Sequence, residues 1–264
     1  MVWIASYIVL GSAVGLLAGL LGVGGGLLIV PMLSFLFTAQ GFNPDYILHM
    51  AIGTSLGSIA FTSVSSLLSH HRQKAVIWRA MIAITPGIIV GTFAGSFVAA
   101  RLSTGFLKGF FGIFLYYVAT QMFIGIKPKA TRRLPKAPGM LAAGSVIGSF
   151  SSLVGIGGGS LSVPFLVWCN TGMHHAIGTS AAIGFPIAVS GGIGYIVTGL
   201  HTPGLPDHTL GFVHLYSLFG IAATSVLTAP LGAHLAHRLP VDKLKKIFAF
   251  LLYAIATKMV ISLF

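Results

Sequence analysis

Long apolar segments separated by short polar stretches run through the whole chain. In order, they occupy residues 4–38, 47–69, 80–100, 104–124, 139–172, 175–199, 213–235 and 243–263. A helix needs about 20 apolar residues to cross the roughly 30 Å hydrocarbon core of a bilayer. Most of these segments have that length, so the pattern predicts an all-α polytopic membrane protein.

The first and fifth segments have a different form, because each is too long for one simple span and short for two. Each carries a glycine cluster near its centre: residues 22–31 are GVGGGLLIVP, and residues 155–164 are GIGGGSLSVP. Two arms of about 15 residues would each rise about 22 Å as helix, which is less than the membrane core. The glycines therefore predict either a re-entrant helical hairpin or a long broken helix.

The glycine motif is one of several landmarks that recur in the same order. The sequence AIGTS occurs at 51–55 and again at 176–180, and Ala-Thr-x-Met occurs at 119–122 and 256–259. Repetition in one order predicts two homologous halves. We expect an N-terminal repeat at 1–125, a basic cytoplasmic linker at 126–138 and a C-terminal repeat at 139–264.

Charge predicts how the two halves are oriented. The stretch 70–79 is basic and is expected on the cytoplasmic side, whereas its counterpart 200–212 has no Lys or Arg and is expected outside. Equivalent loops on opposite sides indicate inverted repeats, each with a broken or re-entrant glycine-rich helix pair plus three spans. The competing model counts each long segment as one crossing, which gives eight spans and parallel halves.

Composition narrows the class of function. Hydrophobic residues make up 55% of the chain and charged residues 7%, with a mean hydropathy of +0.96. The three acidic residues, Asp45, Asp207 and Asp242, all lie between the apolar segments. A membrane core without carboxylates weighs against a cation channel or cation antiporter. The net charge of +12 favours anions, although most of it is explained by cytoplasmic loops.

Other chemistry finds little support. The single cysteine, Cys169, excludes an intrachain disulfide and a cysteine-based zinc site. We find no metal site, cofactor motif, nucleophile–base pair or nucleic-acid patch. The sequence therefore predicts a protein that is not an enzyme.

The glycine clusters are the first candidate for binding. Each precedes an apolar run that can restart a helix, and a helix N-terminus presents unpaired N–H groups and a positive dipole end. Glycine lets an anion approach that backbone, although it also permits close helix packing. Because the motif is duplicated, we favour an anion site. It comprises Gly24, Gly25, Gly26, Gly157, Gly158, Gly159 and Ser160.

Polar side chains of the AIGTS motifs are the second candidate. The hydroxyls of Thr54, Ser55, Thr179 and Ser180 can donate to an oxyanion, or they can form interhelical hydrogen bonds. The pattern favours neither alternative. His49 and His174 precede the motifs at equivalent positions. They are candidates for proton-linked or anion contacts, but interfacial residues with satisfied hydrogen bonds are the favoured interpretation.

Two copies of Gly-x-Gly-Gly-Gly…Val-Pro, each followed by Gly-Thr-Ser, resemble the TauE/SafE sulfite exporter family, also called the four-toluene sulfonate uptake permease family. The resemblance covers residues 5–263. It implies a multi-pass inner-membrane transporter of small sulfur oxyanions or sulfonates, such as sulfite and thiosulfate. The expected partners are that anion and membrane lipid. We expect an exporter that works by alternating access at a midplane site, the alternative being an anion-selective channel with the same glycine-lined site.

Overall fold

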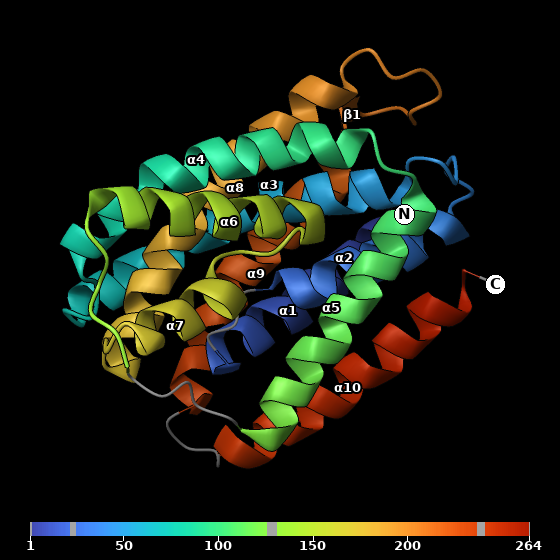
Figure 1. The fold of residues 1–264 in the computed structure, drawn as a ribbon. Helices are drawn as coiled ribbons and strands as arrows, with labels where there is room; N and C mark the ends of the chain where they lie inside the picture. Colours follow the sequence, from blue (N-terminus) through green and yellow to red (C-terminus); the bar gives the residue numbers. More distant parts are fainter. Residues whose placement is uncertain (1, 22–24, 126–130, 237–240, 264) are drawn as a thin grey trace.

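The computed structural model describes residues 2–21, 25–125, 131–236 and 241–263 (Figure 1). Each half contributes five helices within these ranges. The first half has α1 (Val2–Leu21), α2 (Gly26–Ala39), α3 (Ile47–Arg72), α4 (Trp78–Ala100) and α5 (Thr104–Ile124). The second has α6 (Ala137–Val154), α7 (Gly159–Trp168), α8 (Met173–Gly199), α9 (Leu215–Ala236) and α10 (Val241–Ile261). A hairpin of β1 (Thr209–Leu210) and β2 (Val213–His214) precedes α9, and the sequence pattern missed it.

The helices have the length and composition of a polytopic membrane protein. Within the described residues, six helices are long and apolar enough to cross a bilayer: α3, α4, α5, α6, α8 and α9. Large apolar side chains cover their outer surfaces, as in Val90, Ile113 and Leu227, which are each more than half exposed. This confirms the all-α multi-span class. The segment 243–263 was also expected to span, but α10 is not among the six.

The two long apolar segments break unequally, which corrects the expectation of two arms of about 15 residues. The helices before the breaks, α1 and α6, have 20 and 18 residues, whereas α2 and α7 have 14 and 10. At about 1.5 Å per residue, the longer arms rise roughly 30 and 27 Å, close to the membrane core. Helix α6 runs on until Gly155, whose φ of +70° is the left-handed conformation that ends helices.

The third helix is also longer than its apolar segment. Helix α3 continues through His70, His71 and Arg72, so the connection to α4 is shorter than the basic stretch 70–79 that was expected as a loop. Basic side chains in the last turn are stabilised by the negative end of the helix dipole. The basic residues at 70–72 are therefore part of this helix and do not end it.

The centre of the bundle is the pair α3 and α8, which are the most buried of the six candidate spans. The two helices run antiparallel. Gly53 lies against Tyr195, Leu56 lies against Gly191, and Ser63 near the end of α3 lies close to Gly184.

Two further pairs join the halves through glycine contacts. Helix α1 packs on α9, and α4 packs on α6 along one side of the molecule (Figure 1). The two helices of each pair run parallel. In the α4–α6 pair, Gly87 lies against Leu141 and Gly91 lies against Ser145. A Cβ atom at Gly91 would lie 2.1 Å from the Ser145 carbonyl oxygen, so only glycine permits this approach.

The last pair, α5 and α10, lies at another edge of the molecule (Figure 1). Two hydrogen bonds link it, each with 2.7 Å between oxygens: Tyr116 to Thr257, and Tyr253 to Thr120. Tyr116 and Tyr253 precede the two Ala-Thr-x-Met repeats at the same spacing. Equivalent residues therefore exchange partners, and the two helices run antiparallel.

The α4–α6 contact predicts different outcomes for two glycines. We expect Gly91→Ala to destabilise the protein by about 1–3 kcal/mol, because its Cβ meets backbone that cannot turn aside. Gly109→Ala on α5 is the matched control, since its Cβ would lie 3.7 Å from its nearest neighbour, a Leu263 methyl. Thermal unfolding of detergent-solubilised protein measures both. Equal unfolding midpoints would contradict the packing described.

Candidate functional site

Two short helices begin at the repeated glycines. Gly25 is the N-cap of α2 and Gly158 is the N-cap of α7, and neither residue caps its helix with a side chain. Gly24, the third glycine predicted for the first copy, lies outside the described residues. The structure thus places helix starts at both glycine motifs.

The two glycine motifs touch each other. A Cβ atom at Gly26 would lie 2.5 Å from the Gly155 carbonyl oxygen and 2.8 Å from Cα of Ile156. The Ile59 side chain of α3 packs against both motifs. Its nearest atoms would lie 3.1 Å from a Cβ atom at Gly26 and 3.3 Å from a Cβ atom at Gly157. We call the contact between 25–26 and 155–158 the glycine junction.

The start of α7 offers backbone donors at this junction. The first four N–H groups of a helix have no acceptor within it, and Ser162 is the first residue whose N–H reaches back, to the Gly158 carbonyl at 2.8 Å. The positive end of the helix dipole stabilises a nearby anion by about 0.3–2 kcal/mol, depending on burial. Glycine at 157, 158 and 159 keeps side chains away from that backbone.

Buried hydroxyls without partners lie at the same helix start, where Ser160 and Ser162 belong to α7 and Ser180 lies beside its N-cap. In the part of the chain that the structure describes, no hydrogen-bond partner is found for the hydroxyls of Ser151, Ser160, Ser162 and Ser180. A Cβ at Gly158 would lie 3.1 Å from Oγ of Ser162 and 2.9 Å from the Ser180 carbonyl oxygen. An unpaired buried hydroxyl costs about 1–3 kcal/mol, so such a group indicates a place for a ligand or water.

The hydroxyls belong to one half only. Where the second motif has Ser160 and Ser162, the first has Leu27 and Ile29, both buried and apolar. The sequence prediction included Ser160 of the second motif but overlooked Ser162. An alignment of the two motifs shows these two differences and could have identified Ser162 as a candidate.

Three of the four predicted hydroxyls tie elements together. Thr54 accepts a hydrogen bond from the His214 N–H, and Thr179 accepts one from the Ile77 N–H, each at 2.9 Å. Ser55 donates to the Gly155 carbonyl at 2.8 Å.

These bonds match the interhelical alternative, and Ser180 alone of the four is without a partner among the described residues. The two threonines accept in these bonds, so their own O–H groups remain available as donors.

The two predicted histidines lie away from the junction. Nε2 of buried His49 lies 3.1 Å from the carbonyl oxygens of Ala99 and Leu102, at the α4–α5 turn. His174 is exposed and its ring faces that of His175. The contacts of Nε2 satisfy one side of the His49 ring, but its buried Nδ1 has no hydrogen-bond partner among the described residues, so the interpretation of a residue with satisfied hydrogen bonds holds only in part. The two histidines occupy unlike environments.

His214 is a residue that the sequence did not single out. It precedes α9, and its ring lies among Tyr7, Phe37 and Phe42 while Nδ1 contacts the Ser217 hydroxyl at 2.7 Å. Burial, together with nearby His208, lowers the pKa of His214 to about 4. The ring is therefore neutral at pH 7, and its backbone N–H holds Thr54. Nothing in its local sequence reveals this, because its partners come from distant elements.

No metal centre is assigned within the described ranges, where no group of three or more His, Cys, Asp or Glu side chains gathers. The six apolar helices within these ranges define a polytopic membrane protein. The chain belongs to the sulfite exporter TauE/SafE family, whose model matches residues 7–259.

Similar proteins are named as membrane transporters. The chain is 36% identical over 253 residues to a "Probable membrane transporter protein" of Haemophilus influenzae, with 96% of each chain covered. It is 31% identical to one from Methanocaldococcus jannaschii, covering 85% of this chain and 83% of that one. It is 30% identical to YdhB of Bacillus subtilis, covering 92% and 94%. No solved structure matches the chain.

The hydroxyl contacts predict which residues support the fold. We expect Thr54→Val and Thr179→Val each to lower the free energy of unfolding by about 1–3 kcal/mol, because the first leaves a buried N–H and the second a partly buried N–H without an acceptor. Ser180→Ala removes a hydroxyl that has no partner in the described structure and should leave stability unchanged or slightly raised. Chemical denaturation in detergent compares the three, and a Ser180→Ala loss as large as the threonine losses would refute this division.

Proposed function

We propose that this protein carries a small sulfur-containing anion, such as sulfite, thiosulfate or an organosulfonate, across the inner membrane. The anion binds at the glycine junction. The observation that carries the proposal is the start of α7, where unpaired backbone N–H groups coincide with the unpartnered hydroxyls of Ser160, Ser162 and Ser180. A sulfonate or sulfite group has several oxygens that accept hydrogen bonds from such donors.

The chemistry of the junction favours an anion over a cation. Hydroxyl groups can serve either, but backbone N–H groups donate only, and a helix start attracts negative charge. Of the three carboxylate residues, Asp45 and Asp207 lie in the connections before α3 and before β1, and Asp242 lies in the first turn of α10. Thr54 and Thr179 complete the proposed site as donors, whereas Ser55 acts by fixing the Gly155 carbonyl.

Helix directions support inverted halves. Equivalent helices pack against each other in two places, α3 on α8 and α5 on α10, and both pairs are antiparallel. A two-fold axis along the membrane normal would leave equivalent helices parallel. The antiparallel pairs therefore favour an axis perpendicular to the helices, in the plane of the membrane. Inverted repeats of this kind alternate access to a site near the midplane. The short helices α2 and α7 then begin inside the membrane, as re-entrant or broken segments.

Electrical driving force favours export. An inside-negative membrane potential drives an anion outward with about 2.3 kcal/mol per charge per 100 mV. An anion channel with the same glycine-lined site would use the same force, and unitary currents in a planar bilayer would identify it.

Transport in proteoliposomes tests the proposal. We expect counterflow of at least one of sulfite, thiosulfate and sulfoacetate. Ser162→Ala should raise the KM roughly ten-fold, because it removes a hydrogen bond to a charged group, and Ser180→Ala should act alike. The absence of counterflow with all three anions would reject the function.

Two further variants locate the site. Gly158→Val should abolish binding, because even its Cβ would lie 2.9 Å from the Ser180 carbonyl oxygen. Ser145→Ala is the matched control, since that hydroxyl is exposed and bonds within its own helix. Retained transport in folded Gly158→Val protein would place the site elsewhere.

Orientation is tested separately. Single cysteines at Thr202 and Ala130, each in a Cys169→Ala background, should be labelled by an impermeant thiol reagent from opposite sides of the membrane. Labelling of both from the same side of intact cells would refute inverted halves. Transport activity of each variant shows that the labelled protein is native.

A further inference from the structure

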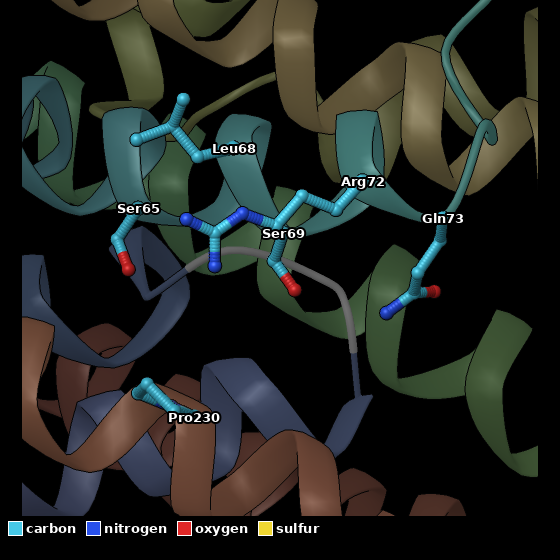
Figure 2. A pocket seen from close by; sticks show the side chains of 6 residues that line it. All are labelled: Ser65, Leu68, Ser69, Arg72, Gln73 and Pro230. Atoms are coloured by element: carbon cyan, nitrogen blue, oxygen red, sulfur yellow. The ribbon is translucent and has the colours of Figure 1, made fainter.

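A cavity of about 390 Å³ opens at the C-terminal end of α3. Five of its lining residues come from the last turns of α3 and its C-cap, and one comes from α9 across the gap (Figure 2). They are Ser65, Leu68, Ser69, Arg72, Gln73 and Pro230. The volume is ample for a sulfite or sulfonate group with its water.

The polar lining of this cavity consists of hydrogen-bond donors. Figure 2 shows the Arg72 side chain running back along α3, past Ser69 and toward Leu68 and Ser65, instead of out beyond the helix end. No Asp or Glu lines the cavity, and within the described residues Arg72 forms no ion pair. Guanidinium beside hydroxyl and amide groups is a donor set suited to an oxyanion.

One face of α3 connects the cavity with the glycine junction. At 100° per residue, its polar side chains fall within about 80° of one another. They are Thr54, Ser58, Thr62, Ser65, Ser69 and Arg72. Along that face, burial decreases from Thr54 and Ser58, which are fully buried, through half-buried Ser65 to exposed Arg72. Arg72 joins the face only because α3 continues past its apolar segment.

The inner end of the cavity is close to the junction along the helix axis. Ile59 contacts both glycine turns, and Ser65 lies six residues further on, which is about 9 Å of helix. Arg72 itself lies thirteen residues beyond Ile59, about 20 Å along the helix, and its side chain runs back toward Ser65 on a face that offers hydroxyls.

We infer that the cavity is a loading vestibule, in which Arg72 binds the sulfur oxyanion on the side of the α3–α4 connection before it reaches the glycine junction. The inference rests on the proposed function, because it assigns the same anion to a second, outer site. The alternatives for Arg72 are a lipid phosphate and the carbonyl end of its own helix, and both are outcomes of the tests below.

The first test is transport with the anion supplied from one side at a time. Arg72→Gln should raise the sulfite KM roughly ten-fold from the α3–α4 side, because a charged hydrogen-bond donor is lost, with kcat nearly unchanged. The KM from the other side should not change, and Arg72→Lys should restore part of the affinity. Arg79→Gln is the control, as an exposed basic residue of α4 outside the cavity. Equal KM values for Arg72→Gln and the parent protein would overturn the inference.

The second test does not depend on transport. Ser69→Cys in a Cys169→Ala background should favour a sulfonate-bearing methanethiosulfonate over a trimethylammonium-bearing one, relative to the rates of both reagents with a free thiol, and sulfoacetate, which does not react with the reagents, should protect it. The preference should fall several-fold with Arg72→Gln. Protein in a phosphate-free maltoside detergent excludes lipid as the ligand.

The two tests separate the claims. A charge preference that depends on Arg72, together with protection by sulfoacetate, in a protein without counterflow would support the vestibule and reject the transport function. A preference that is unaffected by Arg72→Gln would reject the vestibule, even where transport is intact. A preference without protection by sulfoacetate would assign Arg72 to lipid or to its helix end, and would also reject the vestibule.

Discussion

The contact between Gly26 and the turn at Gly155 and Ile156 is the constraint on which the rest of the structure depends. Backbone that leaves a helix inside a membrane must find its hydrogen bonds and its packing within the protein. Here the second broken segment finds them partly in the first half, because Ser55 of α3 donates to the Gly155 carbonyl and Ile59 of the same helix packs against Gly157. The central position of α3 and α8 follows from this, since these helices carry the side chains that close the junction.

Much of this arrangement could be predicted from local sequence. The apolar segments, the repeat and the helix starts at Gly25 and Gly158 follow from hydropathy, self-similarity and glycine. What the sequence did not show depends on distant contacts. The role of the Thr54 hydroxyl could not be assigned, because its partner is the backbone of His214. The length of α3 was underestimated, since Arg72 has the polarity of a loop residue and yet lies in the last turn of the helix.

The symmetry of the scaffold and the asymmetry of the site have different causes. Thr54 and Thr179 hold equivalent backbone positions, and Tyr116 and Tyr253 exchange partners, so the framework keeps both copies alike. The unpartnered hydroxyls at the helix start are found in the second copy, where Ser160 and Ser162 replace the apolar Leu27 and Ile29. Packing of the helices requires that the two halves fit each other. A single polar helix start, in contrast, is sufficient to hold one small ligand.

The reciprocal threonine bonds also have a consequence for biosynthesis. Thr54 is separated by 160 residues from the N–H group that it accepts. At roughly 5–20 residues per second, the ribosome needs about ten to thirty seconds to supply that partner. During this interval α3 is already made while its central hydroxyls lack their native neighbours. The native contact of Thr54 therefore forms only after His214 has been made, so the two halves can join at this point only when most of the chain has been synthesised.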